Sequence, residues 1–210
     1  MTYENYIFYP LSKTNGHYVF KNKLDIFDSL KLKQKEKDVT FCKIKNQKAY
    51  PKGSFDKSLL LKYNKYLFGD LYPFAGETKK WDLSKAQEIL GGYSVHYCPA
   101  NYVDSSLDDV FRLLNKIEKN ENIEKLSKQI ADAWAYLWQI HPFYEGNTRT
   151  TGLFMIELLK SKGIDFNVDC MNKGYHVFRN ALVLYSVQKE DELNSLVLEG
   201  ISCNQKELIL

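Results

Sequence analysis

The sequence contains no apolar run that approaches the roughly 18 residues a helix needs to cross a membrane. Its first ten residues, MTYENYIFYP, also lack the basic start and the following apolar stretch of a signal peptide. We therefore expect a protein that makes no membrane contact and works in the cytoplasm.

Cysteine is scarce, and no two cysteines form a C-x-x-C pair. The four of them are scattered along the chain: Cys42, Cys98, Cys170 and Cys203. Three histidines likewise lack the spacing of metal ligands: His17, His96 and His176. Isolated reduced thiols of a cytosolic protein explain this pattern better than a disulfide or a zinc site does.

The chain also lacks a strong charge of either sign, an internal repeat and a low-complexity linker. Its formal net charge is +3 and its pI is about 8.5, which is too mild to indicate a nucleic-acid partner. The lysines of residues 31–38 mix with acids and are typical of a solvated helix face. With 210 residues, of which 44% are hydrophobic, the sequence predicts one domain over residues 1–210.

Most of the chain carries the apolar spacing of amphipathic helices, so the expected fold class is mainly α. The pattern is strongest over residues 104–119 and 122–140. Another helix is expected to start at Ser54, as its N-cap, and to end before the break at Pro73. The remaining helices are expected over residues 23–38, where Leu24, Ile26, Phe27, Leu30 and Leu32 are the apolar positions, and over residues 148–163, 174–188 and 190–203.

The segment 78–97 interrupts this helical pattern. Trp81 and Leu83 alternate with polar neighbours, the glycines at positions 91 and 92 supply a turn, and Tyr93 and Val95 begin a second alternation. This pattern predicts a loose β-hairpin, although an ordinary surface excursion would show the same alternation.

The stretch HPFYEGNTRTTG, residues 141–152, has the parts of a phosphate site. Asn147 and Thr148 begin a helix, whose free N–H groups and partial positive charge attract phosphate. Gly146 lets the backbone approach a ligand, and the amide of Asn147 can donate to phosphate. Arg149 can grip phosphate with two hydrogen bonds. Because a helix N-terminus disfavours a cation, the position of Arg149 indicates a bound anion.

Two further residues of this stretch suit phosphorus chemistry. Beside a polyphosphate, Glu145 is a natural ligand for Mg²⁺. His141 titrates near neutral pH and can take a proton from an incoming hydroxyl. Taken singly, each residue is equally typical of a helix end followed by a turn. Their combination favours transfer of a phosphorus group to a hydroxyl.

The stretch resembles the motif of the Fic-domain family, H-x-F-x-[D/E]-G-N-x-R-x-x-R. The matching residues are His141, Phe143, Glu145, Gly146, Asn147 and Arg149. Residues 68–77, FGDLYPFAGE, resemble the segment before the family's flap hairpin, and residues 19–30, VFKNKLDIFDSL, resemble its N-terminal entry. The similarity covers most of residues 15–200.

The resemblance implies a helical Fic fold with a small β-hairpin flap at residues 78–97. Such enzymes usually move AMP from ATP, with Mg²⁺, to a Tyr, Ser or Thr hydroxyl of a target protein or of themselves. His141 would be the general base and Glu145 the Mg²⁺ ligand. Gly146 and Asn147 would hold the α-phosphate and Arg149 the neighbouring phosphates, and the adjoining Thr148 would be a further nucleotide-binding residue. Phe143 would be a core anchor, and the target would add a strand to the flap.

The chain departs from this motif at two positions. Thr148 stands where the family often has glycine, which the first turn of a helix tolerates. Gly152 replaces the last arginine, which in the family contacts the terminal phosphate of ATP. Two alternatives therefore stay open: a transferase of the same fold that uses another nucleotide or transfers phosphate, and a module that binds a nucleotide or partner without catalysis.

A second match lies in the predicted helix at residues 190–200. Ser195 and Glu199 are four residues apart, hence on one helix face, and fit the family's inhibitory motif [S/T]-x-x-x-E-[G/N]. The resemblance implies that Glu199 obstructs ATP, and that the chain can form a homo-oligomer. An ordinary amphipathic helix with Glu199 in water would show the same pattern.

Overall fold

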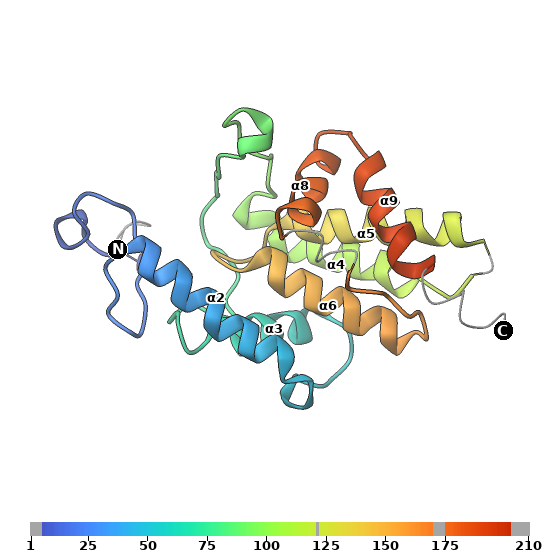
Figure 1. Cartoon of the computed structure of the whole chain (residues 1–210), viewed down its shortest axis with the longest axis horizontal. Helices are drawn as coiled ribbons and strands as arrows, with labels where there is room; N and C mark the ends of the chain where they lie inside the picture. Colours follow the sequence, from blue (N-terminus) through green and yellow to red (C-terminus); the bar gives the residue numbers. More distant parts are fainter. Residues whose placement is uncertain (1–5, 121, 170–174, 203–210) are drawn as a thin grey trace.

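The chain folds into a bundle of helices, and the computed structural model describes residues 6–120, 122–169 and 175–202 (Figure 1). The α-helices are α2 (Ser29–Lys45), α3 (Lys57–Phe68), α4 (Val103–Asn115), α5 (Ile123–Ile140), α6 (Asn147–Ser161), α8 (Tyr175–Tyr185) and α9 (Asp191–Ser202). Between them lie the 3-10 helices Leu11–Lys13, Gln47–Ala49, Glu88–Leu90 and Ala100–Tyr102. The mainly α fold class is confirmed. None of the helices described here has the length and apolar character that crossing a membrane requires.

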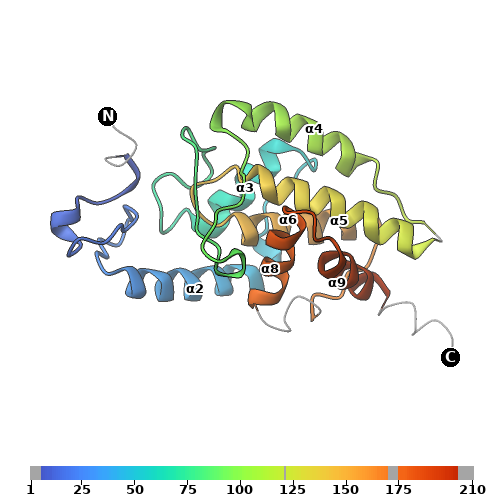
Figure 2. The same cartoon turned by 90° about the horizontal axis from the view of Figure 1, so that it is seen from above.

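Helix α5 lies at the centre of the bundle and packs against α4, α6, α8 and α9 (Figures 1 and 2). Its apolar face buries Ile130, Trp134 and Trp138 almost completely. Each buried aromatic side chain of this size contributes several kcal/mol of stability, on the order of 3–5 when truncated to alanine. The rigid α5–α6 pair is therefore the frame on which the loop between them is held.

The start of α2 differs from the prediction for residues 23–38. The helix begins at Ser29, and the Asp28 carboxylate caps it by accepting from the N–H of Lys31 at 2.8 Å. The side-chain oxygen of Asn22 accepts from two backbone N–H groups, of Leu24 and Ile26, and this holds residues 22–26 in a turn. Apolar spacing before Asp28 was therefore not a helix signal.

The buried face of α2 is also more polar than the sequence indicated. Leu32 is buried together with Glu36 and Thr40, while Leu30 is 73% exposed. Residues 31–38 are thus not only a solvated face, since Glu36 points inward from it. At α3 the N-cap is Asp56, which accepts from the N–H of Leu59 at 3.0 Å, and not Ser54 as predicted.

The 78–97 segment turns back on itself but forms very little β-structure. Among the described residues its only ladder contact is the antiparallel bridge between Ala86 and Ser94. The residues between them are taken up by the 3-10 helix Glu88–Leu90 and by the predicted glycine turn. The prediction of a β-hairpin is therefore corrected to a hairpin-shaped excursion, which rises from the helical body in Figure 1.

The side chain of Asn64 in α3 is hydrogen-bonded to Gly76, to the 141–146 loop and to α6. Its side-chain N–H₂ donates to the carbonyl of Glu145 at 3.2 Å and to the hydroxyl of Thr150 at 3.1 Å. Its side-chain oxygen accepts from the N–H of Gly76 at 2.8 Å. The side chain is buried, so these bonds have no competition from water and fix the 141–146 loop on α3.

Asn64→Ala is expected to lower the free energy of unfolding by about 1–3 kcal/mol, because it leaves buried partners unsatisfied. Chemical denaturation measures the change. Asn115→Ala, at an exposed residue that ends α4, is the matched control and is expected to stay within about 0.5 kcal/mol of the parent. Equal effects of the two variants would contradict the tie assigned to Asn64.

Candidate active site

The loop between α5 and α6 is closed by the side chain of Asn147. Its oxygen accepts from the N–H of Phe143 at 2.9 Å, and its N–H₂ donates to the carbonyl of the same residue at 2.7 Å. Asn147 is buried, and so is Phe143, as the sequence predicted for a core anchor. The amide of Asn147 is therefore a staple of the loop, whereas the sequence had suggested a donor to phosphate.

Gly146 stands at the N-cap of α6 with φ +80°, a conformation that L side chains rarely adopt. A Cβ atom there would lie 2.1 Å from the ring of Phe68 in α3. The glycine is thus required by packing as well as by backbone geometry. With no side chain at this position, the main chain at the start of α6 lies directly on an aromatic ring.

His141 ends α5 in the left-handed conformation, with φ 50° and ψ 57°. Its ring stacks on Tyr97 with centroids 4.0 Å apart and meets Trp138 edge-on. Both ring nitrogens are buried without a hydrogen-bond partner. Burial, reinforced by the positive charges of Lys85 and Lys79, holds the pKa of His141 well below its ordinary value of about 6.5. The imidazole is therefore neutral at physiological pH, as a proton acceptor must be.

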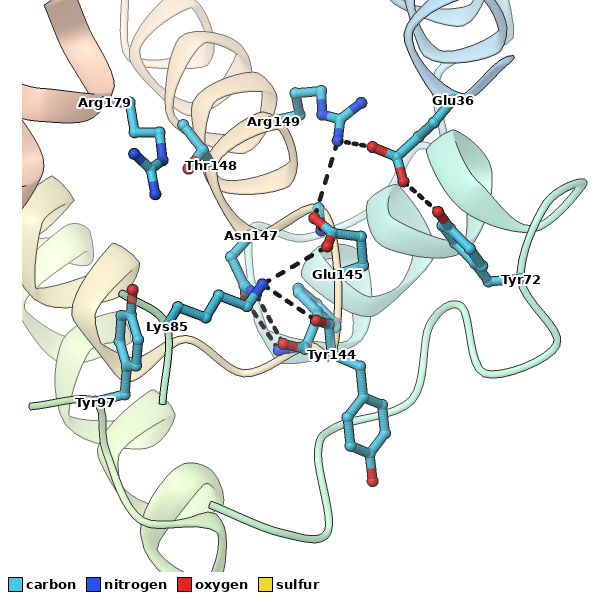
Figure 3. A network of polar contacts seen from close by, with 12 residues as sticks. Glu36, Tyr72, Lys85, Tyr97, Tyr144, Glu145, Asn147, Thr148, Arg149 and Arg179 are labelled. Carbon is cyan, nitrogen blue, oxygen red and sulfur yellow. Dashed lines mark hydrogen bonds and ion pairs between the residues drawn. The ribbon is translucent and has the colours of Figure 1, made fainter. Parts of the chain in front are cut away.

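Glu145 lies between two cations at the mouth of α6 (Figure 3). Its carboxylate is 3.6 Å from the Lys85 ammonium and 4.0 Å from the Arg149 guanidinium, and it accepts from the N–H of Gly146 at 2.7 Å. Burial opposes ionisation, but these positive neighbours outweigh it and hold the pKa of Glu145 below its usual value. The carboxylate is thus charged and a quarter exposed.

Arg149 is engaged by α2, which the sequence analysis did not connect with the site. Its guanidinium forms an ion pair with Glu36, donates to the hydroxyl of Thr40 at 3.1 Å and lies 4.8 Å from the centre of the Phe68 ring. The hydroxyl of Tyr72 also donates to Glu36. A phosphate bound at Arg149 would therefore share the guanidinium with the Glu36 carboxylate.

Besides Arg149, three cations from outside the motif surround the loop, and spacing along the sequence did not reveal them. Lys79 is buried and donates to the carbonyl of Ile140, and burial lowers its pKa to about 8. Lys85 donates to the carbonyl of Tyr144 at 3.4 Å. Arg179 of α8 donates to the side chain of Gln87. The resemblance pointed to the 78–97 segment as a flap, but nothing in its pattern singled out Lys79 or Lys85.

The remaining predicted positions lie on α6 and α9. The hydroxyl of Thr148 accepts from the indole N–H of Trp138 at 2.9 Å, which joins α6 to α5. Gly152 is buried in the second turn of α6. Ser195 is exposed and Glu199 half-buried on α9, a helix that packs against α5 and α8. An inhibitory role of Ser195 and Glu199 stays a prediction.

The donor set at this loop suits a magnesium–phosphate ligand. Magnesium is usually held by one or two carboxylates together with substrate phosphates, and the charged, partly exposed Glu145 provides such a carboxylate. Across the described residues no group of three or more histidine, cysteine or acidic side chains could hold a metal by itself.

The free energy of unfolding is expected to fall as the pH drops below about 6.5. In that range the unfolded chain binds a proton on His141 that the folded chain does not, so the slope approaches about 1.4 kcal/mol per pH unit until the folded pKa is reached. Denaturant titrations of the parent and of His141→Asn at several pH values measure it. The variant should lack this contribution, whereas His96→Asn, at an exposed position, should keep it. Parallel curves for all three proteins would refute the buried neutral imidazole.

Gly146→Ala is expected to destabilise the protein more than Gly163→Ala. Both glycines have positive φ, but a Cβ at Gly163 would meet nothing within 4 Å. The second change should therefore cost only backbone strain, about 1–2 kcal/mol. The first adds a clash with Phe68, which costs a further ~1–3 kcal/mol. Thermal unfolding compares the two, and equal losses would contradict the packing constraint.

Comparison with known proteins supports the resemblance read from the motif. The curated "Probable protein adenylyltransferase y4lH" of Sinorhizobium fredii is 25% identical over 155 residues, which is 72% of this chain and 76% of that protein. "Protein adenylyltransferase VbhT" of Bartonella schoenbuchensis is 29% identical over 117 residues, which is 56% of this chain and 23% of that protein.

Solved structures have the same fold. The BepC effector of Bartonella tribocorum with bound AMPPNP superimposes with a TM-score of 0.73 at 20% identity, covering 90% of this chain and 96% of that one. The N-terminal FIC domain of Bep8 from Bartonella sp. 1-1C also gives 0.73 at 20% identity, covering 90% and 93%. The model of the Fic/DOC family matches residues 54–159, which include α3, the 78–97 segment and the loop, and the chain therefore belongs to this family.

Proposed function

We propose that this protein transfers AMP from ATP to a hydroxyl side chain of a target protein. The observation that carries the proposal is the buried, neutral His141 at the entrance of a loop whose other end is the N-terminus of α6. The names of the two curated relatives and the AMPPNP bound to BepC are consistent with this chemistry.

The reaction would be an in-line displacement at the α-phosphorus. The target's hydroxyl oxygen forms a bond to that phosphorus, the bond to the bridging oxygen of the β-phosphate breaks, and pyrophosphate leaves. The unprotonated ring nitrogen of the neutral His141 imidazole accepts the hydroxyl proton, and it is available to do so because neither ring nitrogen has a hydrogen-bond partner. The free N–H groups at the start of α6 stabilise the charge that develops on the phosphorus oxygens.

Glu145 would hold Mg²⁺ together with the phosphates, as its charge and exposure allow. The ion would supply neutralisation of charge on the leaving pyrophosphate. Glu145 would exchange its contacts with Lys85 and Arg149 for the metal. The cations released in this exchange would then face the phosphates.

The target would enter along the 78–97 segment. Tyr97 covers the His141 ring, and its hydroxyl accepts from the side chain of Gln87 at 3.1 Å. The Tyr97 ring therefore has to move before a hydroxyl reaches His141. Because this segment contains a single bridge, its arms could pair with an extended target backbone, which is the strand addition that the family resemblance implies.

Inhibition by Ser195 and Glu199 is a finer part of the proposal. Glu199 lies half-buried near the end of α9, and its motif matches the family pattern. If Glu199 obstructs the donor, Glu199→Gly raises transfer without changing the chemistry at His141. A homo-oligomer that covers the site would add to this inhibition.

Incubation with α-labelled ATP, Mg²⁺ and a cell lysate is expected to label protein, more strongly for Glu199→Gly than for the parent. His141→Ala should reduce the rate by about 10²–10⁴-fold, because it removes the proton acceptor. Gel autoradiography measures the label, and intact mass of the protein detects a self-modification equal to one AMP moiety. A thermal melt confirms that each variant is folded.

The same experiment separates the rival functions. Label from γ-labelled ATP, with none from α-labelled ATP, would indicate phosphate transfer by the same fold. Label from another nucleotide would indicate another donor, which the missing arginine at Gly152 favours. Nucleotide binding in a calorimeter without label in any variant would indicate a binding module. The adenylyltransferase proposal is abandoned if neither the parent nor Glu199→Gly transfers AMP.

A further inference from the structure

We propose that Lys85 is a positioning residue that binds the phosphate chain of the donor nucleotide, in place of the arginine missing at Gly152. The inference rests on the proposed function only in taking a nucleotide as the ligand. It adds a phosphate-binding residue from the 78–97 segment, outside the motif of residues 141–152.

The ammonium of Lys85 already lies over the loop, although the residue is far from it in sequence. It is 3.6 Å from the Glu145 carboxylate and 3.4 Å from the carbonyl of Tyr144 (Figure 3). The backbone N–H of Lys85 donates to the Ser94 hydroxyl at 3.0 Å, and its carbonyl accepts from Gln87 at 2.8 Å. The main chain at Lys85 is thus anchored independently of the ammonium, which is aimed at the loop.

Glu145 marks the place where an anion fits between these cations. Its carboxylate lies within 4.0 Å of both Lys85 and Arg149, at the positive end of α6. If Glu145 held Mg²⁺ beside the phosphates, Lys85 would lose its acidic partner. A phosphate oxygen is the replacement that restores the ion pair and keeps the ammonium compensated.

Neither of the two arginine positions of the motif supplies an uncompensated positive charge in this chain. Gly152 provides no side chain at the second of them. Arg149, at the first, already pairs with Glu36, so part of its charge is compensated by α2. The Lys85 side chain is 31% exposed, which allows the ammonium to turn from Glu145 to a ligand without unfolding the segment. Of the charged neighbours of His141, Lys85 also lowers the pKa of its imidazole the most.

The test measures binding of AMPPNP and of adenosine to the full chain by calorimetry, in the presence of Mg²⁺, for the parent and three variants. Lys85→Ala is expected to weaken AMPPNP binding about tenfold, equivalent to about 1.4 kcal/mol, and to leave adenosine binding within about twofold. Lys85→Arg should restore most of the loss. Lys80→Ala is the matched control, because Lys80 belongs to the same segment, is 59% exposed and has an ammonium that pairs with Glu77.

Salt separates a phosphate contact from a structural effect. At about 1 M salt, where the Debye length is ~3 Å, the difference between the parent and Lys85→Ala should shrink. Equal AMPPNP affinities of these two proteins at low salt would overturn the proposal. So would an equal loss for AMPPNP and adenosine, or a failure of Lys85→Arg to recover affinity.

The binding experiment can reject the assignment of Lys85 without rejecting the proposed function, and the labelling assay can do the reverse. A tenfold loss in Lys85→Ala, in a protein that transfers no AMP in the labelling assay, would keep the assignment of Lys85 and reject the transferase. Transfer of AMP by the parent, with unchanged AMPPNP binding in Lys85→Ala, would reject the assignment of Lys85 alone.

Discussion

The two hydrogen bonds between the Asn147 side chain and the backbone of Phe143 are the interaction on which the site depends. They close the irregular chain of residues 141–146 between two helices, and they do so out of contact with water. Because α6 begins at Asn147, the same residue closes the 141–146 loop and starts the helix whose first N–H groups lie at the end of that loop. The positions of Glu145 and Arg149 follow, since both are within two residues of this staple.

The site is built from charges that are already paired with one another. Lys85 pairs with Glu145 and Arg149 pairs with Glu36, and each pair is partly withdrawn from water. A partly buried charge that loses its partner costs more than the pair itself contributes. A phosphate that bound here as proposed would therefore replace the carboxylates as partners of Lys85 and Arg149, so its binding would be an exchange of ion pairs.

Local signals were enough to predict much of the fold. Helices α4, α5 and α6 were predicted because the apolar spacing that identifies each helix lies within its own residues. The motif of residues 141–152 was recognised because it too is a continuous stretch of sequence. The start of α2 was missed because the Asn22 side chain holds the preceding backbone in a turn. The hairpin was over-predicted because alternation of polar and apolar residues does not reveal a 3-10 helix at its tip.

The side chains that complete the site could not be predicted, because each reaches it from another part of the chain. Asn64 and Glu36 come from α3 and α2, more than eighty residues before α6, and in the sequence they look like ordinary polar residues of a helix surface. Only the packing of α2 on α3, and of α3 on α6, shows that these surfaces are interior.

A side chain from a distant part of the chain could also take the place of the arginine that the family motif has at position 152, where this chain has glycine. An arginine in the second turn of α6 acts through the motif itself, whereas a lysine carried by the 78–97 segment acts from across the mouth of the loop. An ammonium on such a segment approaches phosphate only when the segment is in place, and this segment also carries Tyr97, which covers His141. A displacement of the segment that uncovers the imidazole would therefore also move the ammonium, so the proposed phosphate contact of Lys85 and the access of a hydroxyl to His141 would be coupled through one segment of backbone.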